Sequence, residues 1–171
     1  MTKLLKIIIT VLLISPKVLM SADMSGYLLS KAIKEFNNKN YESAYKSLTN
    51  IAPAGNPVAN YLLGQMYLKG LGIEPNYKIA YDMILYSSQK LFGHDKSLAI
   101  ESQITLSNMY ANGIGTDTDK SKSYMWAYIA YKTSENIHLT YLESLQSTIP
   151  PEDIKNIENN GLKLFRKIIK D

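Results

Sequence analysis

The sequence predicts an all-α protein, built as a short solenoid of stacked helical hairpins. One helix-sized phrase occurs twice, as LGQMYLKGLG at residues 63–72 and as LSNMYANGIG at residues 106–115. Both copies end in Gly-X-Gly, they lie 43 residues apart, and each is followed by a second stretch with helical spacing of its apolar residues. A fixed period of this kind is typical of proteins in which helical hairpins stack side by side.

The N-terminal segment, residues 1–22, has the layout of a secretory signal peptide. Lys3 and Lys6 make a positive start, an apolar run follows at residues 7–14, and small residues stand at Ser21 and Ala22. We therefore predict a cut after Ala22, with Ser21 as the other candidate, and a periplasmic or secreted mature protein. An uncleaved membrane anchor is the alternative, although the apolar run is shorter than the roughly 20 residues that span a bilayer.

The charge of the chain argues against nucleic acid and membrane surfaces as partners. The formal net charge is +4, but residues 1–22 hold three lysines and no acidic residue. Their removal leaves 16 basic against 15 acidic side chains, which are interspersed. We expect no nucleic-acid partner, and no membrane association after signal removal. The absence of cysteine excludes disulfides and thiolate sites.

The first helix of the first copy has one apolar face. Ala59, Leu63, Met66 and Tyr67 follow the spacing i, i+4, i+7 and i+8, which places them on one side of a helix. Gly64 lies on that same side. A glycine inside a helix costs about 1 kcal/mol relative to alanine, so we expect a neighbouring helix to approach closely at this position.

The turn and the returning helix also repeat. Gly70 and Gly113 are expected to end the first helices in the left-handed conformation, and the second glycine of each copy lets the chain reverse. Asn76 and Asp119 are the expected N-caps of the returning helices. The expected apolar faces of those helices are Ile79, Ala80, Met83 and Ile84 in the first copy and Met125, Trp126, Ile129 and Ala130 in the second.

The pattern A-x-x-x-L-G-x-x-Y-x-x-G-x-G, followed by an N-cap and a second helix with Ala-x-x-aromatic, resembles the Sel1-like repeat, a relative of the tetratricopeptide repeat. The resemblance implies a right-handed α-solenoid with a C-terminal capping helix, of about four hairpins including the cap. It divides the mature chain into a tetratricopeptide-like hairpin at 25–55, a lengthened first repeat at 56–94, a degenerate second repeat at 95–135 and capping helices at 136–171. About seven extra residues around KLFGHDKSL predict a lengthened helix over residues 76–92.

The two ends of the array carry their own signals. In NNKNYESAYKSL, Tyr41, Ala44 and Leu48 stand where a tetratricopeptide-type hairpin has its turn-Tyr-x-x-Ala-x-x-Leu pattern. Near the other end, Pro151 opens a final helix that resembles the closing cap of such arrays. We expect this helix to cover the last hairpin.

The sequence contains no recognisable catalytic, cofactor-binding or metal-binding constellation. His94 and His138 lie 44 residues apart without ligands at helical spacing. The segment DTDKSK starts like a calcium loop at Asp117, but Lys122 stands where the loop needs glycine and Tyr128 where it needs glutamate. We therefore predict a non-enzymatic protein without a cofactor. The alternatives are a hydrolase-type or cell-wall-associated enzyme of the same family, and a regulatory or host-directed role.

The resemblance also implies a binding surface, lined by first-helix positions that do not point into the stack. In this sequence the matching positions are Tyr61, Gln65, Lys69, Ile104, Asn108 and Asn112. Within each copy the three residues recur at i, i+4 and i+8, so they form one stripe along the helix. We expect a monomer that holds a protein or peptide partner on this concave face. The alternative is that these residues are ordinary exposed helix positions.

Overall fold

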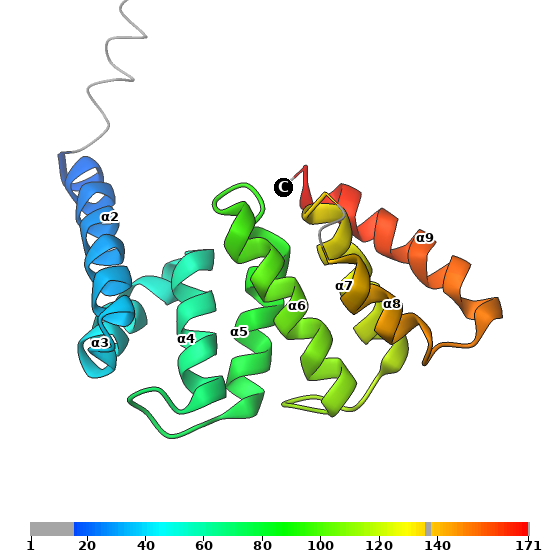
Figure 1. The fold of residues 1–171 in the computed structure, drawn as a ribbon. Coiled ribbons are helices and arrows are strands. Elements are labelled where there is room, and N and C mark those ends of the chain that lie inside the picture. Colours follow the sequence, from blue (N-terminus) through cyan, green and yellow to red (C-terminus); the bar gives the residue numbers. More distant parts are fainter. Residues whose placement is uncertain (1–15, 136–137, 171) are drawn as a thin grey trace, which may run out of the picture.

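The computed structural model describes residues 16–135 and 138–170, with side chains described from residue 24 onward. All regular elements in these ranges are helical: α2 (Pro16–Asn37), α3 (Tyr41–Ile51), a 3-10 turn (Ala52–Ala54), α4 (Pro57–Lys69), α5 (Tyr77–Lys90), α6 (Lys96–Asn112), α7 (Lys120–Thr133), α8 (Leu139–Gln146) and α9 (Pro151–Ile168). The helices lie in a row that starts with α2 and finishes with α9 (Figure 1). This arrangement confirms the predicted all-α solenoid of stacked hairpins.

The first hairpin pairs α2 with α3, and Ala44 and Leu48 are fully buried in it. Helix α2 begins at Pro16, before the predicted start of the hairpin at residue 25, and the predicted cut after Ala22 falls inside the helix. Most of the predicted signal segment, residues 1–15, lies outside the described residues. Within the described ranges, no helix has the length and apolarity that crossing a membrane requires.

The two repeat hairpins, α4 with α5 and α6 with α7, use the same turn chemistry. Gly70 and Gly113 end the first helices at φ values of 65° and 67°, in the left-handed region that favours glycine. The side-chain oxygen of Asn76 accepts a hydrogen bond from the Ile79 N–H at 3.0 Å, and that of Asp119 accepts one from the Lys122 N–H at 2.8 Å. Both predicted stops and both predicted N-caps are confirmed.

The second glycine of each turn touches the preceding hairpin. Gly72 and Gly115 have φ values of 70° and 72°. A Cβ atom on Gly115 would lie 2.0 Å from the carbonyl oxygen of Tyr77, and one on Gly72 would lie 2.7 Å from the Cβ of Tyr41. Tyr41 and Tyr77 are the first residues of α3 and α5. The Gly-X-Gly phrase therefore recurs because it both ends a helix and allows backbone contact with the hairpin before it.

The expected lengthening of the helix over residues 76–92 is wrong. Helix α5 has 14 residues, the same number as α7. The extra residues instead form the turn after Lys90 and the first turn of α6, which has 17 residues against 13 in α4. The physical reason is the N-cap Asp95, whose side chain accepts a hydrogen bond from the Leu98 N–H at 3.0 Å and starts a new helix there.

Gly64 marks the closest approach of α4 and α5. A Cβ at this position would lie 2.8 Å from Cγ1 of Ile84 and 3.4 Å from Cβ of Met83. The prediction of a tight helix–helix contact at Gly64 is confirmed. In the second copy the equivalent Ser107 is also fully buried, and its hydroxyl donates to the carbonyl oxygen of Ser123 at 2.7 Å.

The apolar core consists of three clusters that each join neighbouring hairpins. The first links α2 and α3 to α4, the second links α5 to α6 and α7, and the third links α7 to α8 and α9. The predicted apolar faces of α5 and α7 are at least partly buried except at Ile79, which is 37% exposed. Ile79 lies in the first turn of α5, and the first buried residue of that helix is Ala80.

The final helix of the C-terminal cap, α9, begins with Pro151, as predicted, and packs against the last repeat hairpin. Gly161 of α9 lies against α7, where an added Cβ would be 3.2 Å from the Tyr128 ring and 3.5 Å from the Met125 side chain. The Tyr124 hydroxyl donates to Glu158 of α9 at 2.8 Å. Helix α9 therefore covers α7 with both apolar and polar contacts.

Candidate functional site

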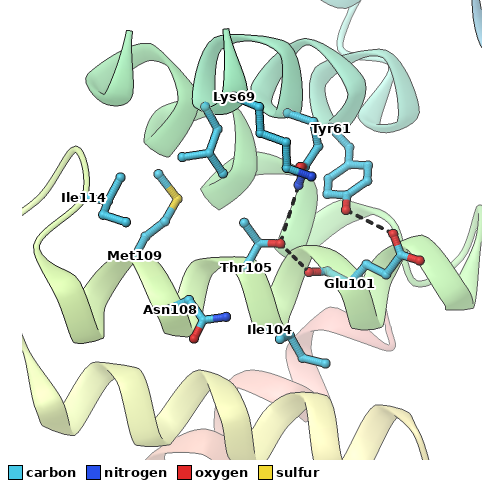
Figure 2. A pocket seen from close by; sticks show the side chains of 10 residues that line it. Tyr61, Lys69, Glu101, Ile104, Thr105, Asn108, Met109 and Ile114 are labelled. Carbon is cyan, nitrogen blue, oxygen red and sulfur yellow. Dashed lines mark hydrogen bonds between the residues drawn. The ribbon is translucent and has the colours of Figure 1, made fainter. Parts of the chain in front are cut away.

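The α4–α6 groove is a depression of about 340 Å³ between the first helices of the two repeats. Side chains from α4 and α6 face each other across it (Figure 2). The residues that line it are Tyr61, Gln65, Leu68, Lys69, Glu101, Ile104, Thr105, Asn108, Met109 and Ile114. The groove thus lies between the same helices on which the sequence placed the partner-binding residues.

Five of the six predicted partner-binding residues line this groove: Tyr61, Gln65, Lys69, Ile104 and Asn108. The sixth, Asn112, does not. It lies one turn beyond Asn108, is exposed, and donates from its side-chain amide to the Asn108 carbonyl oxygen at 2.9 Å. The structure therefore brings the two predicted stripes together in one groove, with the exception of Asn112.

Two of these residues are more buried than expected. Tyr61 is 5% exposed and Gln65 is 6% exposed, because α6 packs beside α4 at this level. The expectation that both point away from the stack is wrong, although both still contribute to the groove wall. Lys69 and Asn108 are exposed and Ile104 is half-buried.

A hydrogen bond between the two helices closes one end of the groove. The Tyr61 hydroxyl donates to the Glu101 carboxylate at 3.1 Å (Figure 2). Burial raises the pKa of Tyr61, and the negative charge of Glu101 raises it further. The phenol therefore keeps its proton and acts as a donor at this site.

Gln65 lies in the middle of the α4 wall. Its side-chain amide nitrogen donates to the Thr105 hydroxyl oxygen across the groove at a long 3.5 Å, and that hydroxyl donates to the Glu101 carbonyl oxygen at 2.8 Å. The Gln65 carbonyl oxygen is shielded from solvent and accepts no hydrogen bond from the described residues. The groove wall therefore holds an unused hydrogen-bond acceptor.

Lys69 adds a positive charge to the α4 side of the groove (Figure 2). Lys69 is exposed and takes part in no ion pair within the part of the chain that the structure describes. Asn108 forms the edge on the α6 side, where its side-chain oxygen accepts a hydrogen bond from the Tyr141 hydroxyl of α8 at 2.9 Å. The cap helix α8 therefore holds one rim residue in place.

Sequence reasoning missed five lining residues: Leu68, Glu101, Thr105, Met109 and Ile114. Two of these residues could have been found from their helical spacing to a predicted position. Leu68 follows Gln65 by three residues and Glu101 precedes Ile104 by three, so each lies on the same side of its helix as a predicted position. Helical spacing could not have indicated Ile114, because it lies in the turn after α6 and only the tertiary fold brings it to the groove.

The other sequence candidates have structural explanations. Asp119 caps α7, so the segment that begins like a calcium loop is an N-cap turn. His138 precedes α8 without a side-chain capping bond. Across the described ranges, His, Cys, Asp and Glu form no group of three or more that is placed to hold a metal ion.

The repeated hairpins match a known family. Residues 57–85 and 100–132 fit the family model of the Sel1 repeat. The chain contains two Sel1 repeats. The matched ranges cover α4 with most of α5, and most of α6 with nearly all of α7, which are the two hairpins with equivalent caps and glycine contacts. Sel1-repeat folds generally mediate protein–protein interactions and are typically non-enzymatic scaffolds.

A solved structure supports the fold beyond the two Sel1 repeats. It is the crystal structure of a protective antigen present in uropathogenic Escherichia coli strains, described as displaying an SLR fold. The similarity has a TM-score of 0.74 at 16% sequence identity, and covers 86% of this chain and 32% of the antigen. At this identity the likeness shows the α-solenoid fold, and the chain spans about a third of the antigen's length. The search of curated proteins found no match.

Proposed function

We propose that this protein is an exported, non-enzymatic adaptor that binds a protein or peptide partner in the α4–α6 groove. The observation that supports this most is the convergence of both Sel1 repeats on one groove, to which each contributes its first helix. In this proposal the protein acts as a monomer, has no nucleic-acid partner, and does not associate with the membrane after signal removal.

The chemistry of the groove suits a polypeptide segment. Leu68, Ile104, Met109 and Ile114 supply apolar surface, and amide, hydroxyl and charged groups stand around them. Protein-binding surfaces combine apolar anchors with polar groups that pair with a backbone. A volume of about 340 Å³ accommodates a few side chains of an extended segment but not a folded domain.

The enzymatic alternative receives less support from the same residues. The groove lining contains one carboxylate, Glu101, and it is paired with a tyrosine whose pKa is raised. Neither histidine belongs to the lining. A hydrolase needs a nucleophile with a base in hydrogen-bond reach, and the lining residues do not supply that pair.

Affinity capture with a groove variant and a matched surface variant tests the adaptor function. Ile104→Arg introduces a bulky charge into the groove, whereas Ile79→Arg makes the same change on the exposed first turn of α5, outside the groove. We expect the mature wild type and Ile79→Arg to recover the same partner from an extract of the native host. Ile104→Arg, shown to be folded by circular dichroism, should lose that partner. Equal recovery by both variants would disprove the groove assignment.

Export is the second part of the proposal. The positive start, apolar run and small residues of segment 1–22 support it. Mass spectrometry of protein from the native host should find an N-terminus close to Asp23 in the periplasmic or culture fraction. An intact N-terminus in the membrane fraction would support the anchored alternative instead.

A further inference from the structure

The cap helix α8 contacts the rim of the α4–α6 groove through one tyrosine. The Tyr141 hydroxyl donates to Oδ1 of Asn108 at 2.9 Å, and the same hydroxyl oxygen lies 2.9 Å from Oγ of Ser107. Asn108 and Ser107 are neighbours on α6, whereas Tyr141 follows Asn108 by 33 positions in the chain. The second Sel1 match ends at residue 132, so this contact comes from the cap and from neither repeat.

The position of the Tyr141 hydroxyl is fixed by its surroundings. The Tyr141 side chain packs against the apolar cluster that links α7 to α8 and α9. Ser107, on the other side of the hydroxyl, is fully buried against α7. Burial raises the pKa of Tyr141, and the hydrogen bond with Ser107 offsets only part of that rise. The phenol therefore keeps its proton at neutral pH and can donate it to Asn108.

This hydrogen bond decides which atoms Asn108 offers to the groove. A carboxamide has one acceptor oxygen and an NH₂ group with two donors. Oδ1 is used by Tyr141, and in Figure 2 the amide nitrogen of Asn108 points toward Ile104 while the oxygen points away from it. Asn108 is exposed and lines the groove, and its Nδ2 donates no hydrogen bond within the described ranges. Two N–H donors are therefore available at the rim.

The other amide side chains of the two predicted stripes are not available in the same way. Gln65 is buried, and its amide nitrogen donates to the Thr105 hydroxyl oxygen. The amide nitrogen of Asn112 donates to the Asn108 carbonyl oxygen, and Asn112 lies outside the groove lining. Among these three amides, Asn108 is therefore the one that combines exposure, a place in the groove and an NH₂ group without an acceptor among the described residues.

We propose, on the basis of the function proposed above, that Tyr141 is a positioning residue of the groove, and that it holds Asn108 so that its NH₂ group donates to a main-chain carbonyl oxygen of the bound polypeptide. A polypeptide offers one such acceptor per residue, whatever its side chains. A donor that is held in place before binding loses little conformational entropy when the partner arrives. Helix α8 thereby belongs to the binding site, although it lies outside both Sel1 repeats.

A peptide selected on the protein itself serves as the probe. A phage-displayed library of random peptides is selected on the wild type, and sequences that Ile104→Arg also retains are discarded. The most enriched remaining peptide is labelled with fluorescein, and its Kd is measured by fluorescence anisotropy for each variant. Tyr27→Phe removes a hydroxyl from a side chain that is 66% exposed and outside the groove, so it should bind the probe like the wild type.

Variants of Asn108 test the donor. Asn108→Asp keeps an oxygen for Tyr141 but replaces the NH₂ group with a second oxygen. We expect it to retain its thermal stability and to bind the probe about tenfold more weakly or worse, because an acceptor then faces an acceptor. Asn108→Ala should bind about fivefold more weakly, since it loses one hydrogen bond to the peptide.

A double-mutant cycle tests the positioning role of Tyr141. Tyr141→Phe, shown to be folded by circular dichroism, should bind the probe about threefold more weakly, because Asn108 is no longer held. In the Asn108→Ala background, Tyr141→Phe should cause no further loss, since it acts on binding through Asn108. A general effect of Tyr141 on the fold would weaken binding equally in both backgrounds.

The outcomes separate this inference from the proposed function. Unchanged affinity of Asn108→Asp, or losses that add in the double variant, overturns the inference. A library that yields no peptide dependent on Ile104 overturns it as well, because a donor to the main chain should accept peptides of many sequences. If Ile104→Arg nevertheless loses the native partner in affinity capture, the adaptor function stands and only the roles of Asn108 and Tyr141 are wrong.

Discussion

The hydroxyl oxygens of Tyr81 and Tyr110 lie 2.7 Å apart, although the two residues are 29 positions apart in the chain. The rings meet edge to face at 5.7 Å. The same contact occurs one hairpin earlier, where the hydroxyls of Tyr45 and Tyr67 lie 2.9 Å apart and the rings 6.1 Å apart. Each pair joins the second helix of one hairpin to the first helix of the next.

The C-terminal cap continues this series with a different partner. Tyr45, Tyr81 and Tyr124 are each the fifth residue of the second helix in their hairpins. At the last junction Tyr124 donates to the carboxylate of Glu158 on α9, at 2.8 Å, instead of meeting a tyrosine. The Glu158 carboxylate accepts the hydrogen bond that a tyrosine hydroxyl takes part in at the two earlier junctions.

We expect the free energy of unfolding to fall at high pH, because the folded state raises the pKa of tyrosines in both pairs. Burial raises the pKa of Tyr110, and the hydrogen bond with Tyr81 raises it further; the bond with Tyr45 and burial raise the pKa of Tyr67 to about 12. The folded state holds these phenol protons more tightly than the unfolded state does. Their contribution to folding stability is therefore fully present below the unfolded tyrosine pKa of about 10, and it is lost as the pH rises through the folded pKa. Urea unfolding at pH 8, 10 and 11 should show a falling free energy of unfolding.

Tyr110→Phe identifies the residue responsible. At pH 8 the variant should be about 1 kcal/mol less stable, since it loses one hydrogen bond. Between pH 10 and 11 its stability should fall less steeply than that of the wild type, because one titrating group is gone. Tyr27→Phe, at a position that is 66% exposed, is the control and should follow the wild type. Parallel slopes for Tyr110→Phe and wild type would contradict the prediction.

Gly115→Ala should be among the more damaging single-methyl additions in this chain. The new Cβ would lie 2.0 Å from the Tyr77 carbonyl oxygen, and the residue has a positive φ of 72°. Steric overlap and backbone strain together should cost about 2 kcal/mol or more. Gly93→Ala, where no atom lies within 4 Å of the added Cβ, is the matched control. Similar urea midpoints for the two variants would mean that the hairpins separate at Gly115 without cost.

Gly64→Leu should loosen the contact between α4 and α5. Its Cβ alone would lie 2.8 Å from Ile84, and overpacking of this kind typically costs about 1–3 kcal/mol. The control is Gly26→Leu, also inside a helix, where the Cβ meets nothing within 4 Å. Thermal unfolding followed by circular dichroism should show a lower midpoint for Gly64→Leu and none of that loss for Gly26→Leu. An unchanged midpoint for Gly64→Leu would show that the two helices can move apart freely.

The two N-caps should respond differently to acid. Burial tends to raise the pKa of Asp119, but hydrogen bonds from Lys122 and its charge outweigh this, and the pKa is lowered. The contribution of the ionised Asp119 to stability is present above the unfolded aspartate pKa of about 3.9, and it is lost as the pH falls through the folded pKa. Asp119→Ala should cost about 1 kcal/mol at pH 7, and the difference from wild type should shrink at more acidic pH.

Asn76→Ala is the control for this effect, because Asn76 caps α5 in the same position with an amide that does not titrate. It should cost about the same at pH 7, also about 1 kcal/mol. Its deficit should not depend on pH. A deficit of Asp119→Ala that stays constant on acidification would show that the charge of Asp119 does not contribute to the cap.

Local chemistry made much of this fold predictable. The stops at Gly70 and Gly113, the caps at Asn76 and Asp119, and the small residue at Gly64 each depend on neighbours within one hairpin. Such features are encoded by φ preferences and side-chain hydrogen bonds, which a sequence shows directly. The length of α5 was mispredicted because the sequence does not show whether extra residues extend a helix or start the next one, and the cap at Asp95 decided that.

Local sequence determined some features of the groove, and tertiary packing decided the others. The sequence determined which side of α4 and α6 carries Tyr61, Gln65 and Ile104, since helical periodicity orders side chains around an axis. Only the tertiary structure decided how deeply α6 covers Tyr61 and Gln65 and that Ile114 reaches the groove. It also decided the role of the second glycine, because contact between Gly115 and Tyr77 depends on how closely two hairpins stack. Stacking distance results from the packing of all the side chains between the hairpins, and no local segment of the sequence encodes it.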